Sequence, residues 1–372
     1  MLLEASCGNL ERCFRLLDAA LECNLLLDGA SFGILAGACR RQQVHQAPLL
    51  ERFVRCYRRS PAMAGLAQAP APHFEDLPPV QAGHSYAKEL MLLQHVRTSA
   101  SRNASAVCRA MEQFGREKLP SSSKWLKIAG GPKAELLSSA VASSPKGLAL
   151  ELGTYCGFSA LHLSCHRKVV TVEADLGHAL IAEKVIAFAG MSQEVEVIVG
   201  HTEDTLPWLM QHLAAKEPGE PLIGFVFMDQ RGSRYQSDLE ILKCSKLLMD
   251  QAVIVADNVL KPGAPKFLWA LSNDPAFRTE VIELEEYAME NVRDWMTIST
   301  YCQPAGPDRA FECTLLPKQI QTLEWRAEMM RNRSHRPQHG GSGVDHRHFR
   351  PKRQGDQVIH IRNTPQLYNL VL

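Results

Sequence analysis

The sequence predicts an α/β fold built on a doubly wound, mostly parallel sheet, and two observations lead to that prediction. From residue 147 onward, short apolar segments rich in β-branched residues alternate with segments of helical spacing. The apolar segments are GLALELG, KVVTVEA, EVEVIVG, LIGFVFMD and AVIVADN. Segments that are apolar on both faces are typical of parallel strands covered by helices on either side of the sheet.

The remaining elements follow the same alternation. Helices are predicted between the strands at residues 157–166, 176–190, 203–214 and 235–249. Two further strand candidates, TEVIELE and WMTISTYC, lie within residues 279–302, and their short connection predicts an antiparallel pair at the edge of the sheet. Two amphipathic helical segments, YAKELMLLQHV and NASAVCRAMEQFGREK, precede the first strand. Together these elements predict one domain over residues 84–304.

The segments on either side of this domain have a different character. Residues 1–58 predict a helical hairpin with a break at Asp28 and Gly29. The hairpin loosely resembles a single pentatricopeptide-type repeat, and because such arrays need about three or more units, a repeat remnant or ordinary hairpin is favoured over an RNA reader. Residues 59–83 predict a proline-rich linker, and residues 305–372 predict a largely disordered tail that is rich in Arg, His and Gly over 331–358.

The composition argues against several classes of protein. The chain has 372 residues, 45% of them hydrophobic and 22% charged, with a formal net charge of +1. That balance gives no reason to expect nucleic acid or an anionic membrane as a partner, and no segment is apolar for long enough to span a bilayer. The 11 cysteines are scattered without a C-x-x-C pair, which favours free thiols over a zinc site. We therefore expect a cytoplasmic protein, and nothing in the sequence demands more than a monomer.

The first predicted strand leads into a glycine loop. In LELGTYCGFSA, Gly153 and Gly157 let the backbone turn tightly and approach a ligand. Glu173, twenty residues after Gly153, ends the second strand. An acidic side chain at that place typically accepts hydrogen bonds from ribose hydroxyls. The G-x-x-x-G spacing suits S-adenosylmethionine better than the G-x-G-x-x-G loop of dinucleotide sites, although dinucleotide binding and a purely structural loop stay as alternatives.

Oxygen-bearing side chains follow the fourth and fifth predicted strands. Asp229 ends one strand, and Asp257 and Asn258 end the next. In a doubly wound sheet these positions share the carboxyl edge with the glycine loop. Two carboxylates and an amide oxygen are suitable ligands for Mg²⁺, whereas the alternative is that they merely cap loops.

Residues 84–304 resemble the catechol O-methyltransferase family. The motifs LELGTYCGFSA, TVEAD, VGHTED, MDQRGSRY and ADNVLKPGAP follow in the order and spacing of that family. The resemblance implies a Rossmann-like class I methyltransferase whose seven-stranded sheet has a reversed last strand. It also implies transfer of a methyl group from S-adenosylmethionine to a catechol-like aromatic diol, with Mg²⁺ as a second cofactor.

The resemblance also implies roles for individual residues. Cofactor contacts are implied for Ala129, Glu151, Gly153, Tyr155, Ser159, Glu173, Thr202, Asp229 and Gln230. Metal ligation is implied for Asp229, Asp257 and Asn258, and contact with the aromatic substrate for Trp125, Asn258 and Pro262. Glu286 matches the acid that binds the second hydroxyl, but the spacing there is shifted, so Glu285 and Glu290 stay as alternatives.

The chain departs from the family at one catalytic position. The family has a lysine three residues after the first metal-binding aspartate, where it accepts the proton of the methylated hydroxyl; this chain has Gly232, preceded by Arg231 instead of an aromatic residue. Loss of a general base typically costs about 10²–10⁴-fold in rate. One hypothesis is an active enzyme in which Lys127 or Lys261 replaces the missing base. The other two are a slow or altered methyltransferase with a different substrate, and a cofactor-binding protein with little turnover.

Overall fold

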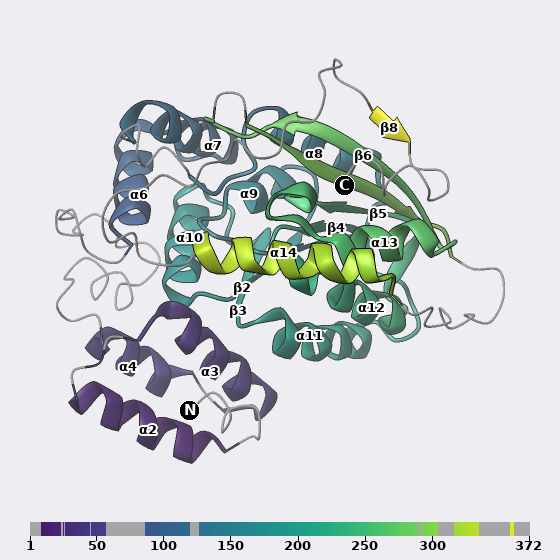
Figure 1. Cartoon of the computed structure of the whole chain (residues 1–372). Coiled ribbons are helices and arrows are strands. Elements are labelled where there is room, and N and C mark those ends of the chain that lie inside the picture. Colours follow the sequence, from purple (N-terminus) through teal and green to yellow (C-terminus); the bar gives the residue numbers. More distant parts are fainter. Residues whose placement is uncertain are drawn as a thin grey trace.

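The computed structural model describes residues 9–23, 25, 27–44, 46–56, 86–119, 126–289, 292–303, 316–334 and 358–360. Its centre is a sheet with strand order β3-β2-β1-β4-β5-β7-β6-β8 (Figure 1). The strands are β1 (Leu148–Leu152), β2 (Val169–Glu173), β3 (Val195–Val199), β4 (Ile223–Met228), β5 (Leu248–Ala256), β6 (Phe277–Glu285), β7 (Arg293–Tyr301) and β8 (Val358–His360). The predicted linker, residues 59–83, lies outside the described residues.

Strand pairing confirms the predicted α/β class and the reversed strand. Strands β1 to β5 pair in parallel, whereas β7 runs antiparallel to both β5 and β6. The predicted edge pair is therefore present, with Phe277 opposite Tyr301, and β7 is the member inserted next to β5. The short strand β8, which pairs antiparallel with β6, was not predicted.

Helices cover both faces of the sheet because the strands are apolar on both sides. Along β4, Phe225 and Phe227 face one core, and Val226 and Met228 face the other. The first core is covered by α6 (Ala87–Ser99), α7 (Ala104–Gln113), α8 (Pro132–Ser143), α9 (Phe158–Ser164) and α10 (Leu176–Phe188). The second core is covered by α11 (Thr202–Lys216), α12 (Tyr235–Ser245) and α13 (Pro265–Asn273).

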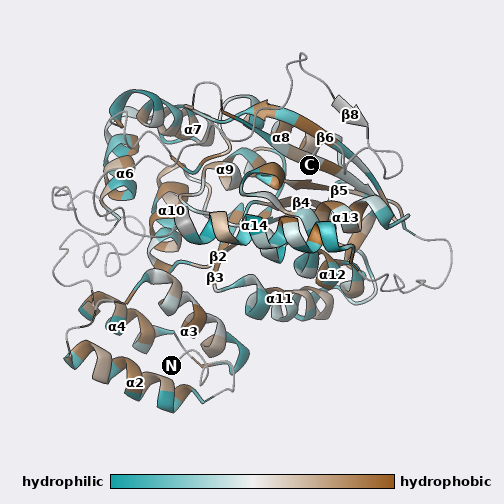
Figure 2. Cartoon of the chain, viewed as in Figure 1, coloured by the Kyte–Doolittle hydropathy of each residue, from teal (hydrophilic) through white to brown (hydrophobic). Residues whose placement is uncertain are grey.

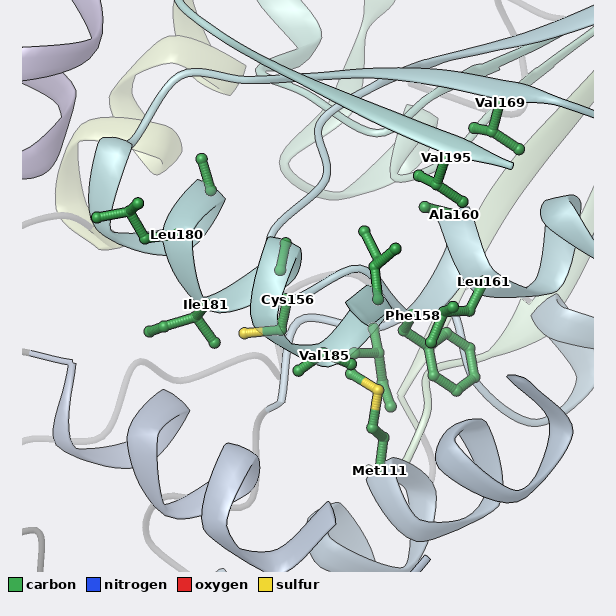
Figure 3. Close-up of a cluster of buried hydrophobic side chains, with 14 of the residues drawn as sticks. Met111, Cys156, Phe158, Ala160, Leu161, Val169, Leu180, Ile181, Val185 and Val195 are labelled. Carbon is green, nitrogen blue, oxygen red and sulfur yellow. The ribbon is translucent and has the colours of Figure 1, made fainter. Parts of the chain in front are cut away.

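Figure 3 shows part of the first core, with side chains such as Met111 of α7, Phe158 of α9 and Val185 of α10. A π-helical turn, η1 (Phe114–Lys118), extends α7. Helices α6 and α7, together with η1, are the two predicted helical segments that precede the first strand.

The N-terminal segment contains three helices, so the predicted two-helix hairpin was incomplete. The helices are α2 (Leu10–Glu22), α3 (Gly29–Arg41) and α4 (Ala47–Cys56). The predicted break at Asp28 is the start of α3, where the Asp28 carboxylate accepts a hydrogen bond from the Ser31 amide at 2.8 Å. In space α3 packs against α10, α11 and β3, so this unit buries its apolar face against the rest of the chain (Figure 1).

The C-terminal segment contains a helix that the prediction of a largely disordered tail missed. Helix α14 (Lys318–Ser334) packs against α13, with Ile320 and Leu323 around Trp269. The helix continues into the Arg- and His-rich stretch 331–358, most of which lies outside the described residues. Figure 2 shows long hydrophilic stretches on α14, in contrast to the hydrophobic strands behind it.

Two further observations concern the described residues as a group. Within the described ranges, no helix is long and apolar enough to cross a membrane. The nine cysteines in those ranges are all free thiols.

Candidate functional site

The glycine loop after β1 packs directly on the loop after β4. Gly153 has a φ of +99° and Gly157 has a φ of +85°. Residues with a side chain rarely adopt these backbone conformations. A Cβ atom at Gly153 would lie 2.6 Å from the Asp229 carbonyl oxygen. Glycine is therefore required at this position, and it brings the predicted cofactor loop into contact with the first predicted metal ligand.

Glu173 lies beneath the glycine loop. Its carboxylate accepts hydrogen bonds from the backbone amides of Thr154 at 3.1 Å, Tyr155 at 2.8 Å and Asp175 at 2.8 Å. A carboxylate has about four acceptor sites, so it can also accept hydrogen bonds from a ligand. The predicted ribose-binding residue thus lies at the carboxyl edge of the sheet and also fixes the shape of the loop.

Glu151 is fully buried one strand away. Its Oε2 accepts a hydrogen bond from the Thr171 hydroxyl at 2.5 Å, whereas Oε1 has no hydrogen-bond partner in the described part of the chain. Burial raises the pKa of Glu151 to about 7, against the opposing effect of the hydroxyls of Ser159 and Thr171. A buried carboxylate oxygen without a donor is suited to a cationic group of a ligand.

Tyr155 and Ala129 border the same region. The Tyr155 hydroxyl donates to Glu89 Oε1 of α6 at 2.6 Å, and its ring makes an edge contact with His178. Burial raises the pKa of Tyr155 well above its usual range, so the hydroxyl stays a neutral donor. Ala129 is buried in the segment that precedes α8.

The structure brings Thr202 and Gln230 together through a residue that the sequence analysis missed. Asp238 of α12 is completely buried; it accepts a hydrogen bond from Gln230 Nε2 at 2.9 Å and from the Thr202 side chain. The Gln230 Oε1 atom has no partner within the described ranges. The two predicted adenine neighbours therefore face one another between α11 and the loop after β4.

The predicted metal ligands lie beside a buried lysine that was also missed. Lys133 of α8 is 1% exposed, and its Nζ lies 2.7 and 3.0 Å from the two carboxylate oxygens of Asp257. The same atom lies 2.6 Å from Glu286 Oε1. Burial alone would lower the pKa of Lys133, but the charges of Asp257, Glu286 and Asp294 raise it above its usual range, so this side chain is an ammonium ion.

Asn258 and Asp294 complete the cluster. The Asn258 backbone has a φ of 54°, which asparagine tolerates, and its Nδ2 donates to Asp294 Oδ2 at 3.1 Å. Asp294 Oδ1 accepts from the amides of Leu260 and Lys261, at 3.1 and 3.0 Å. Burial raises the pKa of Asp294 to about 7. Asp294 thereby holds the loop after β5 in place.

Asp229 has a different environment from Asp257. Burial, followed by the charge of Asp257, raises the pKa of Asp229 well above its usual range.

In the described residues, no group of three or more His, Cys, Asp or Glu side chains surrounds a metal position. The predicted ligand set contains only two such side chains, because its third member is an amide.

The other predicted residues are placed as follows. Glu286 belongs to the cluster, whereas its alternative Glu285 is exposed. Lys127 is exposed ahead of α8, and Lys261 and Pro262 are half-buried in the π-helical turn η3 (Val259–Gly263). Ser159 is buried at the start of α9. Trp125 and Glu290 lie outside the described residues.

The parallel sheet with its reversed strand next to β5, and the glycine loop after β1, define a Rossmann-like class I methyltransferase. A family model described as O-methyltransferase matches residues 110–290. Catechol O-methyltransferase B of Danio rerio is 30% identical over 193 residues, which cover 50% of this chain and 69% of that protein. The chain belongs to this O-methyltransferase family.

Two further similarities were found. Catechol O-methyltransferase of Bos taurus is 31% identical over 186 residues, covering 49% of this chain, and this chain spans only 65% of the length of that enzyme. The crystal structure of the O-methyltransferase from Bacillus cereus in complex with SAH is 21% identical, with a TM-score of 0.41, and the match covers 57% of this chain and 90% of that one.

Proposed function

We propose that the chain transfers a methyl group from S-adenosylmethionine to a hydroxyl oxygen of a catechol-like aromatic diol. The observation that carries this proposal is the contact between Gly153 and Asp229. A Cβ atom at Gly153 would lie within 2.6 Å of the Asp229 carbonyl, so the two loops touch. Methyl transfer requires that donor and acceptor lie next to each other, so the contact between the loops after β1 and β4 supports the proposal.

The cofactor half of the site offers a suitable group for each part of S-adenosylmethionine. The donor-free Oε1 atom of Glu151 would accept a hydrogen bond from the ammonium group of the methionine part. Glu173 would accept the ribose hydroxyls, and Thr202 and Gln230 would flank the adenine. Ala129, Tyr155 and Ser159 would close the pocket around the methionine end.

The residues of the acceptor half fit a divalent cation in their chemistry. Asp229, Asp257, Glu286 and Asp294 are four acidic groups, and the ammonium ion of Lys133 pairs with two of them, Asp257 and Glu286. The cluster therefore favours additional positive charge. Asp229, Asp257 and Asn258 would hold Mg²⁺, which when bound lowers the pKa of a coordinated hydroxyl.

The side chains of this chain then have separate tasks. Lys133 stays protonated, so it supplies fixed positive charge beside Asp257 and Glu286 but cannot accept a proton. Glu286 would bind the second hydroxyl of the diol. Because position 232 is a glycine, we expect slower turnover than with a lysine there, or a preference for acceptors whose hydroxyl is already acidic.

The alternative function is a methyltransferase-like protein that binds the cofactor without turning it over, and the absence of a lysine at position 232 is what favours it. No feature of the described residues favours an RNA reader, because α3 packs against the methyltransferase domain.

The test is transfer of a labelled methyl group from S-adenosylmethionine to several catechols, with Mg²⁺ or with a chelator. We expect Asp257→Ala to lower turnover by about 10²-fold or more and to leave the affinity for S-adenosylhomocysteine within about threefold. Glu285→Gln is the matched control, since Glu285 is an exposed neighbour of the cluster, and it should change neither quantity.

Cofactor binding without transfer to any catechol would contradict the proposed activity and support the binding-protein alternative. Unchanged turnover of Asp257→Ala would contradict the proposed role of the carboxylate cluster.

A further inference from the structure

Helix α14 lies outside the region of the family match, yet it packs on the acceptor half of the site. The match covers residues 110–290, and α14 spans Lys318–Ser334. The helix contacts η3, the turn that follows Asn258 and contains Pro262. In Figure 1, α14 is the yellow-green helix that crosses the middle of the view. A segment beyond the family match therefore contacts the turn that carries Pro262, one of the proposed substrate-binding residues.

An arginine of this helix occupies the space beside Gly232. A Cβ atom at Gly232 would lie 3.3 Å from Arg331 Nη2 and 3.1 Å from the Gly263 carbonyl oxygen. Those distances are shorter than an ordinary van der Waals contact, so a side chain at 232 would require its neighbours, Arg331 among them, to shift by a few tenths of an ångström. The guanidinium of Arg331 therefore packs closely against position 232.

The guanidinium is held firmly in that place. Arg331 is 3% exposed, and its Nη2 donates to the Gly263 carbonyl. Its Nη1 donates to Glu324 at 3.1 Å and to Glu328 at 2.8 Å. This side chain thus fixes the loop after β5 to α14 through Gly263.

The loop after β4 is fixed to the same helix. Arg231 forms an ion pair with Glu328 and donates to Asn332 at 2.9 Å. Glu328 is therefore shared by Arg231 and Arg331. Within this group, two arginines face the two glutamates Glu324 and Glu328, so their charges balance. The group is better suited to holding the two loops than to creating a local field.

We propose that α14 is a fixed wall of the acceptor half and that Arg331 is its positioning residue, which ties together the two loops that carry the acceptor-binding side chains. The assignment to the acceptor rests on the proposed function. A guanidinium is always protonated, so Arg331 is not a substitute base for the missing lysine. It acts through Gly263 and the 229–232 loop. Small displacements of such loops change reaction rates strongly, because transfer depends on alignment of the reacting atoms.

The experiment compares three variants of the full chain by hydrogen exchange and by kinetics. Arg331→Ala removes the tie, Arg331→Lys keeps the charge but loses the forked geometry, and Arg326→Ala, an exposed arginine of the same helix, is the control. We expect Arg331→Ala to speed exchange about 10-fold in residues 229–234 and 259–264. Residues 153–157 of the cofactor loop, and the Arg326→Ala control, should be unchanged.

The kinetic readout separates positioning from a general loss of stability. Arg331→Ala should raise the KM for the diol about 10-fold and leave the affinity for S-adenosylhomocysteine within about twofold. The KM of Arg331→Lys for the diol should lie between that of Arg331→Ala and that of the unaltered chain. Equal acceleration of exchange in all three loops, or no acceleration in any, would overturn the inference. If the loops loosen as expected but the unaltered chain methylates no diol, the wall stands and the proposed function fails.

Discussion

Two helices outside the family match, α3 and α14, dock at different places along the same edge of the sheet: α3 beside the outer strands β3 and β2, and α14 beside the central strands β4 and β5. Helix α3 packs on the loops after β2 and β3, on the proposed cofactor half. Helix α14 packs on the loops after β4 and β5, on the proposed acceptor half. Both contacts involve main-chain groups of the loops, but the contacting surfaces of the two helices differ.

The contact of α3 is built from glycines. Gly29, Gly33 and Gly37 recur every fourth residue and so share one face of the helix. A Cβ atom at Gly33 would lie 1.7 Å from the Ala174 carbonyl oxygen, so the helix backbone touches the loop after β2. Polar contacts at the end of the helix are Arg40 to the Val199 carbonyl at 2.6 Å and Arg41 to Asp204 at 2.6 Å.

The difference teaches which property each helix controls. A glycine face permits only backbone contact, so changes to α3 should act first on docking and stability. An inserted arginine that holds two loops should act first on acceptor binding, as proposed for Arg331. The predictions below test α3 and the proposed cofactor half on which it packs, from the largest expected effect to the smallest.

Gly33→Val should detach the N-terminal helices from the loop after β2. A valine side chain cannot fit where a Cβ atom would lie 1.7 Å from a carbonyl oxygen. We expect a loss of about 3 kcal/mol in the free energy of unfolding, measured by chemical denaturation, with faster proteolysis of α2–α4. Gly37→Ala is the control, since a Cβ atom there would lie 3.4 Å from Asp204 Cβ and should be tolerated. Equal stability of both variants would show that α3 docks differently.

Glu151 should make cofactor affinity depend on pH. Its pKa is raised from 4.5 to about 7 by burial, so the free protein holds a proton there that an ammonium ligand would expel. The affinity for S-adenosylhomocysteine should therefore fall below about pH 7, by up to about tenfold per pH unit. Titration calorimetry across this range measures the effect, and Glu151→Gln should abolish the slope; a slope that persists in Glu151→Gln would assign it to another group.

The same shift predicts the sign of a change in stability. The folded chain binds more protons at Glu151 than the unfolded chain between pH 4.5 and about 7. The contribution of Glu151 to the free energy of unfolding therefore decreases as pH rises through this window, and it stays constant above about pH 7. Glu151→Gln should remove this component from the pH profile of chemical denaturation.

Arg41→Ala should have the smallest effect. The Arg41–Asp204 pair is 2.6 Å long, but its side chains are 30% and 25% exposed, so solvent screens it. We expect a loss of at most about 1 kcal/mol in unfolding free energy, and no change in diol KM. A larger loss, or a change in KM, would mean that the polar end of α3 and not its glycine face governs docking.

Most of the fold was predictable because it depends on local patterns. The five parallel strands are continuous apolar segments, and the β6–β7 pair follows from a short connection between two β-rich segments. Helix α14 was missed because its composition is mostly polar. Its inward positions, Ile320, Leu323, Ala327 and Arg331, do have helical spacing, but one of them is an arginine.

The candidate site was predictable only where a motif carries it. Asp229, Asp257 and Asn258 end apolar strands, which brings them to one edge of a parallel sheet. Lys133 gives no such signal, since a single lysine in the first turn of a helix usually faces solvent. Arg331 lies far from Gly232 in the sequence, and only the packing of α14 brings the two together.

The most direct test of the claim that Arg331 leaves little room for a side chain at position 232 is a double-mutant cycle between positions 232 and 331. The unfolding free energies of the unaltered chain, Gly232→Lys, Arg331→Ala and the double variant are measured, with Gly232→Ala as a milder alternative to lysine. We predict that Gly232→Lys costs more with Arg331 present than without it, with a coupling of at least ~1 kcal/mol. Additive costs, within about 0.5 kcal/mol, would contradict the claim.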